Sequence, residues 1–152
     1  MAHEDQFITD PDHWSVLVPE MLVRDLAVSQ GFYCGVLGFA EKFARPEDGF
    51  LYIEMGHAQL MLEEMPKDGD AAWSTGEMKP PFGRGVNFQI EVPDVQALHD
   101  RVQGAGIGLF RPMRTSWYRE GAQENGQSEF LVQDPDGYLL LFMQHLGTRP
   151  AG

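Results

Sequence analysis

The residue types that most often bind metals or act as nucleophiles are few in this sequence, and they are scattered. The histidines show no HxH or HExxH spacing and no pairing with cysteine, which are the usual signs of a metal site; they are His3, His13, His57, His99 and His145. We expect them at the surface and apart from one another. The single cysteine, Cys34, lies in a predicted helix beside Phe32 and Tyr33, so we interpret it as a buried structural residue.

Other short motifs that carry chemistry are also missing. The chain has no GxSxG, no P-loop and no GxGxxG. The segment Asp134-Pro135-Asp136-Gly137 has the DxDG pattern with which a calcium loop begins. Its proline and the lack of later ligands make a tight turn the better interpretation.

The charge balance is strongly acidic. Eleven Lys and Arg against 23 Asp and Glu give a formal charge of −12, which argues against nucleic acid as a partner. The charge either serves solubility alone or concentrates cations near a cleft. No apolar run approaches the ~20 residues that span a membrane, and the polar start does not resemble a signal peptide. We therefore expect a cytoplasmic protein without membrane contact.

Hydrophobic periodicity predicts a strand, a helix and three short β segments in the first half of the chain; they span 14–23, 26–37, 39–44, 49–55 and 58–64. Asp25 is placed to cap the helix and Gly38 to end it. Residues 1–13 show no period and are predicted to form a loose arm. Residues 65–84, rich in proline and glycine, form a linker or a loop that folds over something.

The same order of elements returns in the second half. A strand at 86–92 precedes a helix capped by Asp94, and β segments follow at 109–111, 117–120, 129–133 and 138–144. When Asp25 is aligned with Asp94, residues 18–23 overlie 87–92. The order β–α–β–β–β therefore occurs twice, which predicts one domain over 14–146, built from halves at 14–64 and 85–146. Residues 147–152 are predicted to be a tail.

Several segments within these elements resemble a known family, the vicinal oxygen chelate superfamily of glyoxalases, bleomycin-resistance proteins and dioxygenases. Its opening strand–helix unit is similar to VPEMLVRDLAVSQGFYCGVLGF, and its closing hairpin to FLVQDPDGYLLLFMQ. Members of the bleomycin-resistance type are similar to PPFGRGVNFQIEVPDVQAL. The resemblance covers 14–146. It implies an α+β fold of two βαβββ repeats, whose curved mixed sheets surround a concave cleft, and it implies a homodimer.

The resemblance also implies four positions that hold metal ligands in metal-dependent members of the superfamily. They fall on Val18, Asn87, Leu141 and either Leu60 or Met61. None of these residues is a usual ligand for iron, zinc, nickel or manganese. We therefore predict a protein with no metal, no other cofactor and no catalytic residue inherited from the family.

The concave face of the sheets should instead carry polar and acidic groups. If Phe88 and Ile90 pack under the second helix, then Asn87, Gln89 and Glu91 face the cleft, because alternate residues of a strand share a face. The alignment of the two halves places Glu20 at an equivalent position, together with Val18 and Leu22.

Aromatic residues are available around this face, and for each of them the choice between core and cleft stays open. Of the adjacent Trp117 and Tyr118, we expect one to face the cleft, and Trp73 has an unusual position in the long loop. The candidate ligand-binding set is Glu20, Phe43, Phe50, Tyr52, Asn87, Gln89, Glu91, Trp117 and Tyr118.

Three functions are compatible with these residues. The first is a non-catalytic binder that sequesters a cationic, partly aromatic small molecule, as in antibiotic resistance of the bleomycin type. The second is a lyase, isomerase or dioxygenase of the same fold with an altered or absent metal site, in which Glu20 or Glu91 would act as a base. The third is a homologue in fold alone that binds an unrelated metabolite or partner.

Overall fold

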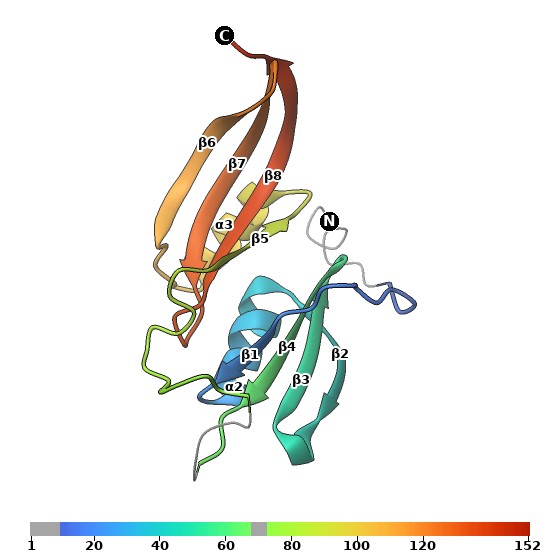
Figure 1. Cartoon of the computed structure of the whole chain (residues 1–152), viewed down its shortest axis with the longest axis vertical. Coiled ribbons are helices and arrows are strands. Elements are labelled where there is room, and N and C mark those ends of the chain that lie inside the picture. The colour runs from blue at the N-terminus through green and yellow to red at the C-terminus, as the bar shows by residue number, and fades with distance from the viewer. Residues whose placement is uncertain (1–9, 68–72) are drawn as a thin grey trace.

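Two four-stranded sheets, each with a helix on one side, make up the molecule (Figure 1). The structure is a computed structural model that describes residues 10–67 and 73–152. The elements of the first half are β1 (Glu20–Val23), α2 (Leu26–Gln30), the π-helix η1 (Gly31–Leu37), β2 (Ala40–Arg45), the 3-10 turn η2 (Pro46–Asp48), β3 (Phe50–Met55) and β4 (Ala58–Glu64). Those of the second half are β5 (Asn87–Glu91), α3 (Val95–Gly104), β6 (Arg111–Glu120), β7 (Gln123–Gln133) and β8 (Leu139–Pro150).

The two halves share one topology. The strand orders are β1-β4-β3-β2 and β5-β8-β7-β6, and in each sheet the first strand pairs in parallel with the last while the other pairs are antiparallel. The predicted α+β fold of two βαβββ units is therefore confirmed. Among the described residues, no helix is long and apolar enough to cross a membrane.

The two helices begin where their capping aspartates predict. Asp25 Oδ1 accepts a hydrogen bond from the N–H of Val28 at 3.1 Å, and Asp94 Oδ1 accepts one from the N–H of Ala97 at 3.0 Å. The first helix continues to Leu37 as expected, but from Gly31 it is π-helical rather than α-helical. It ends at Gly38, whose φ of 90° lies in the left-handed region.

One hydrophobic core joins both halves on the helix side of the sheets. Val23, Ile53 and Leu62 from the first sheet belong to the same cluster of buried side chains as Leu98 of α3 and Phe142 of β8. Figure 1 shows the helices near the middle of the molecule, with the sheets extending away from them in opposite directions. This arrangement leaves one face of each sheet without a helix, and we call it the helix-free face.

The turn between β7 and β8 attaches the second half to the first. Asp134 Oδ1 accepts hydrogen bonds from the backbone N–H groups of Asp136, Gly137 and Tyr138, each at 2.9 Å. Its Oδ2 accepts the hydroxyl proton of Tyr33, on η1, at 2.8 Å. The predicted turn at Asp134–Gly137 is confirmed, and its carboxylate serves the contact between the halves rather than a cation.

Two further contacts reinforce this junction. Asp136 Oδ1 accepts hydrogen bonds from the backbone N–H and from Nε of Arg24, at 3.1 and 2.8 Å. The hydroxyl of Tyr138 donates to the carbonyl of Leu22 at 3.0 Å. Gly137 is required here, because a Cβ would lie 2.4 Å from Pro81 and its φ is 105°.

Burial dominates the ionisation of this network. It raises the pKa of the Asp134 carboxyl, although the Tyr33 hydroxyl and two backbone N–H groups favour the charged form. Burial also raises the pKa of Tyr33 well above its usual value, and the negative charge of Asp134 adds to that shift. Tyr33 is therefore a permanent hydrogen-bond donor to Asp134 at neutral pH.

The predicted element boundaries are wrong in three places. The first strand starts at Glu20 rather than at 14, because residues 14–19 lie outside the ladder. Residue 111 and the predicted segment at 117–120 belong to one strand, β6, which forms a long hairpin with β7 that also includes the residues between the predicted segments. Residues 147–150 are not a tail but the end of β8, since they pair with β7.

The junction can be tested by substituting Asp134. Asp134→Ala removes all four hydrogen bonds and should lower the free energy of unfolding by about 3 kcal/mol. Asp134→Asn keeps the oxygen that caps the turn and should cost about 1 kcal/mol, as should Tyr33→Phe, which removes only the hydroxyl. Urea unfolding followed by circular dichroism measures all three, and equal losses for the Ala and Asn variants would contradict this account.

Candidate functional site

Strand pairing defines the helix-free face of the first sheet. Glu20 of β1 pairs with Met61 of β4, which pairs with Tyr52 of β3, and Tyr52 pairs with Phe43 of β2. Paired residues project to the same side of a sheet, so these four side chains form a row.

The next row of the same face brings another candidate together with two charged residues. It consists of Leu22, Glu63, Phe50 and Arg45. The four candidate residues of the first half, Glu20, Phe43, Phe50 and Tyr52, therefore share this face.

Aromatic rings fill the centre of this face. The ring of Phe43 lies 5.1 Å from that of Tyr52 at an interplanar angle of 23°, and 5.7 Å from that of Phe50. Trp14, from the segment before β1, packs its ring edge-on against Tyr52 at 5.5 Å. Phe50 and Tyr52 are only 5% and 6% exposed, whereas Trp14 is 57% exposed. The rings that a ligand can reach are those of Trp14 and the half-buried Phe43, with Phe50 and Tyr52 beneath them.

The chain places its own cations on these rings. The guanidinium of Arg45 lies 4.0 Å from the centre of the Phe50 ring, and the ammonium of Lys42 lies 4.5 Å from that of Trp14. Such contacts are attractive because the face of an aromatic ring is electron-rich. Lys42 also forms an ion pair of 3.3 Å with Glu54. The surface therefore stabilises positive charge.

Two carboxyl groups lie beside the rings. The carboxyl group of Glu20 lies next to that of Glu63, and Trp73 Nε1 donates to Oε2 of Glu63 at 2.8 Å. Burial raises the pKa of Glu20, and Glu63 adds to the shift by its hydrogen bond and its charge, while Arg45 opposes it. The tryptophan of the long loop thus reaches the acidic pair. Glu63 was not among the predicted residues, although its spacing of two from Met61 on a strand could have identified it.

The second sheet also has a helix-free face, and it holds the candidates Asn87, Gln89 and Glu91. All three are exposed and lie on β5, at the edge of the sheet. Across the strands, the row of Gln89 continues through Leu141 and Leu131 to Arg111. The row of Glu91 continues through Met143 and Glu129 to Arg114. Apolar side chains therefore separate an amide and acidic edge from a basic edge.

The two adjacent aromatics of β6 lie on opposite sides of the sheet. Tyr118 is on the helix-free side, where its hydroxyl donates to Oε1 of Glu129 at 2.7 Å. Trp117 covers Gly126 on the other side, so closely that a Cβ at Gly126 would lie 2.6 Å from its ring. The guanidinium of Arg149 lies 4.0 Å from the Trp117 ring. Tyr118 therefore shares a face with the candidates of β5 and Trp117 does not, while the contact of either ring with a ligand stays a prediction.

Glu129 is a fully buried carboxylate with four side-chain donors. Arg111 Nη2 and Arg114 Nε donate to its Oε1 at 3.1 and 3.2 Å, together with the Tyr118 hydroxyl, and Gln127 donates to Oε2. Burial alone would raise the pKa of Glu129, but the hydrogen bonds from Tyr118, Gln127 and Arg114 and the charge of Arg111 outweigh it, and the pKa is lowered. Sequence reasoning missed this cluster, because its members are brought together only by the β6–β7 pairing.

The positions implied for metal ligands do not form a ligand set. Val18 lies before β1, and Leu60 is in the core, so the residue of β4 on the helix-free face is Met61. Together with Asn87 and Leu141 it offers none of the donors that divalent transition metals prefer. In the part of the chain that the structure describes, no three His, Cys, Asp or Glu side chains are placed to hold a metal ion.

The expectation that the histidines lie apart is wrong for one pair. The rings of His13 and His57 are stacked with their centres 3.9 Å apart, and Asp10 lies 3.7 Å from His57. The contact forms because the segment before β1 folds back onto the β3–β4 hairpin, where Ser15 Oγ donates to the carbonyl of His57 at 2.7 Å.

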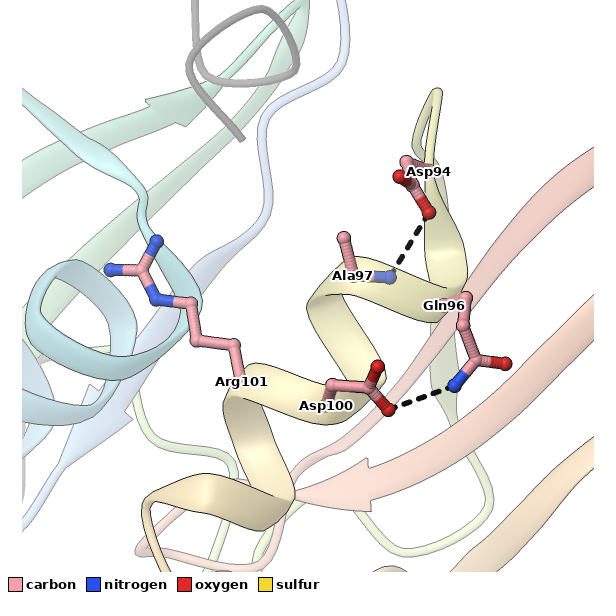
Figure 2. A pocket seen from close by; sticks show the side chains of 5 residues that line it. All are labelled: Asp94, Gln96, Ala97, Asp100 and Arg101. Atoms are coloured by element: carbon pink, nitrogen blue, oxygen red, sulfur yellow. Dashed lines mark hydrogen bonds between the residues drawn. The ribbon is translucent and has the colours of Figure 1, made fainter. Parts of the chain in front are cut away.

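Two pockets adjoin these elements. One, of about 260 Å³, lies where the halves meet and is lined by the candidates Asn87 and Gln89 together with Gln59, Leu60 and Pro19 among other residues. A larger one, of about 530 Å³, opens beside the first turns of α3 (Figure 2). It holds no predicted residue.

The polar groups of the larger pocket mainly stabilise the helix. The Asp94 carboxylate accepts a hydrogen bond from the N–H of Ala97 and so caps the helix, and Gln96 Nε2 donates to Asp100 Oδ1 at 2.8 Å, as Figure 2 shows. Arg101 points toward the first half, where its Nη2 donates to the carbonyl of Gly35 at 3.3 Å.

Comparison with known proteins identifies the class. The model of the glyoxalase/bleomycin resistance protein/dioxygenase superfamily matches residues 13–142, so the chain belongs to this superfamily. Proteins named bleomycin resistance protein, from Geobacillus stearothermophilus and Staphylococcus aureus, are 26% identical over 140 residues, which cover 85% of this chain and 96% of theirs.

Solved structures show the same fold. TioX from Micromonospora sp. ML1 is similar with a TM-score of 0.65 at 20% identity, covering 88% of this chain and 100% of TioX. A glyoxalase/bleomycin resistance protein/dioxygenase from Alicyclobacillus acidocaldarius is similar with a TM-score of 0.60 at 20% identity, covering 92% of this chain and 96% of the other. At such identities the likeness concerns the fold alone.

The Glu129 cluster makes stability depend on pH. At pH 7, Glu129→Gln should lower the free energy of unfolding by about 1–3 kcal/mol, because it leaves two guanidiniums without their shared anion. A carboxyl with a lowered pKa contributes stability above its unfolded pKa and loses it as the pH falls. The difference between wild type and variant should therefore shrink below pH 4.5, the ordinary value for glutamate.

The matched control is Glu124→Gln. Glu124 pairs with Arg149 at 2.7 Å on the same sheet, and the side chain of Arg149 is 51% exposed. Glu124 does not have the additional side-chain donors that surround Glu129 among the described residues. This variant should change stability by no more than about 0.5 kcal/mol. Denaturant titrations of both variants from pH 3 to 7 decide the matter, and similar losses would show that the Glu129 cluster is an ordinary surface ion pair.

Proposed function

We propose that this protein binds a cationic, partly aromatic small molecule without catalysing its conversion, and so sequesters it. The ligand lies on the helix-free face of the first sheet, with its rings against Phe43 and Trp14 and its positive charge near Glu20 and Glu63. One observation carries the proposal. On this face the chain's own cations, Arg45 and Lys42, already lie over aromatic rings beside carboxylates.

The relatives support the same reading. The similar proteins from Geobacillus stearothermophilus and Staphylococcus aureus are named for bleomycin resistance. An identity of 26% does not transfer the ligand itself. The chemistry of the face, acidic and aromatic, selects positively charged ring compounds as a class.

The ligand displaces Arg45 and leaves Lys42, which is buried and paired with Glu54, in place. Arg45 is 47% exposed at its side chain and is held by Asp48 at 3.0 Å, so its guanidinium can move aside at small cost. Trp73 is 44% exposed and contacts Glu63, which places a third large ring at the rim of the same face. From the second sheet, the exposed Asn87, Gln89 and Glu91 add hydrogen-bonding and acidic groups for the part of the ligand that extends beyond β1.

The raised pKa of Glu20 supports a second candidate, a metal-free enzyme in which this carboxyl transfers a proton. General acids and bases often have shifted pKa values because burial and like charges surround them. The two candidates differ in outcome. An enzyme releases altered product from a bound ligand over time, whereas a sequestering protein returns the ligand unchanged after denaturation, as mass spectrometry would show.

Binding of bleomycin by isothermal titration calorimetry tests the proposal. Glu20→Gln and Glu63→Gln should each weaken binding about two- to fivefold, because a partly exposed charge contributes about 0.5–1 kcal/mol. Binding should also weaken at high salt, and as the pH falls through the raised pKa of Glu20, since the protonated carboxyl no longer attracts a cation. Glu91→Gln measures the contribution of the second sheet.

The matched control is Glu47→Gln, an exposed carboxylate in η2 outside both rows of the face. It should leave the affinity within twofold of the wild type. If binding is insensitive to salt and to the substitutions of Glu20 and Glu63, the acidic surface serves solubility alone. The proposal of a cationic ligand must then be abandoned.

The proposal includes a homodimer. Each sheet ends in strands with an unpaired edge among the described residues, β1 and β2 in one sheet and β5 and β6 in the other, and such edges are commonly covered by a partner. A second copy would also enclose the helix-free faces, which are open in a single chain. Light scattering at micromolar concentration should give twice the chain mass of 17.1 kDa, and a single mass would refute the dimer.

A further inference from the structure

Two arginines of β6 are held side by side on the helix-free face of the second sheet. Arg111 Nη2 and Arg114 Nε lie 3.1 and 3.2 Å from the same atom, Oε1 of Glu129. Because both donors converge on one oxygen, the two guanidiniums are neighbours. One carboxylate neutralises only one of them, so the cluster retains a positive charge in a chain whose formal charge is −12.

These guanidiniums have donor capacity that the protein does not use. A guanidinium carries five N–H donors and no acceptor. Nε of Arg111 is buried and has no hydrogen-bond partner among the described residues, which is unfavourable for a polar atom. The side chains of Arg111 and Arg114 are nevertheless 32% and 47% exposed, so their remaining N–H groups can be approached from solvent.

The side chains next to the arginines on this face are apolar. Leu131 pairs with Arg111 and lies beside Leu141, and Met143 lies beside Glu129 in the neighbouring row. Leu131 and Met143 are only 7% and 5% exposed, so of the three side chains on the helix-free face between the arginines and β5, only the half-buried Leu141 is open to solvent. A molecule that places a negative group on the guanidiniums can therefore lay a small apolar body against Leu141.

We propose that Arg111 and Arg114 form a subsite for the oxyanion of a small organic molecule, a carboxylate or a phosphate, whose apolar body lies against Leu141. The planar fork of a guanidinium matches both oxyanions and forms short, charge-assisted hydrogen bonds with them. Glu129 and Tyr118 hold the arginines in place and are positioning residues. The subsite lies on the second sheet, so it stands independently of cation binding on the first.

The probes are phenyl phosphate, benzoate, inorganic phosphate and benzylammonium, each titrated into the 152-residue chain. Arginine Nε–Hε signals in nuclear magnetic resonance spectra report which guanidiniums respond. Phenyl phosphate and benzoate should shift the signals of Arg111 and Arg114 with saturation, and the tighter of the two identifies the preferred oxyanion. Benzylammonium, which has the ring without the negative charge, should leave them unchanged. Inorganic phosphate should bind at least about threefold more weakly than phenyl phosphate, because it lacks the apolar body.

Two variants and a control complete the test. Arg114→Gln should weaken phenyl phosphate binding about tenfold, and Arg111→Lys, which keeps the charge but loses the fork, at least about threefold. Arg149→Gln is matched, since Arg149 is an exposed arginine paired with Glu124 elsewhere on the same sheet, and it should change binding by less than twofold. Equal binding to all three variants, no saturable shift up to 20 mM, or equal affinity for inorganic and phenyl phosphate would overturn the proposal.

Discussion

The buried carboxylates of the β7–β8 turn hold the two halves of this protein together. Asp134 is 5% exposed and receives three backbone N–H groups and the hydroxyl of Tyr33, while Asp136 receives the guanidinium of Arg24. Burying two negative charges is favourable only when such donors surround them. The cost of leaving either one unpaired makes the relative position of the halves specific, in a way that the apolar contacts around them would not by themselves.

The position of this junction determines which faces of the sheets stay open. Because the turn anchors the second half to η1 and β1, the helices and the core lie between the sheets, and the helix-free faces remain available. The two faces differ in charge. The first has carboxylates and rings around Glu20, whereas the second combines an acidic edge at Glu91 with the arginines at Glu129. A ligand with groups of both signs would find complementary surfaces on the two sheets.

Much of the fold could be predicted, because its signals are local. The capping aspartates Asp25 and Asp94, the left-handed Gly38 and the Asp134–Gly137 turn each depend on a few adjacent residues, and the structure confirms them. The β6–β7 hairpin was missed, since its polar strands carry no hydrophobic alternation and are stabilised by pairing with each other. Of the candidate site, Glu20, Asn87, Gln89 and Glu91 are on helix-free faces as the alternation of strand residues predicts.

The sequence by itself determined the superfamily, the doubled βαβββ order and the lack of metal-ligand residues at the implied positions, since all three follow from residue identity and spacing. Only the tertiary structure decided which side chains meet. The contacts of Trp73 with Glu63, and of Arg111 and Arg114 with Glu129, depend on strand register and loop path, which are set by packing across distant parts of the chain. Trp117 and Tyr118 must lie on opposite faces because they are adjacent in a strand, but only the tertiary structure decided that Tyr118 is the one on the side of Glu129.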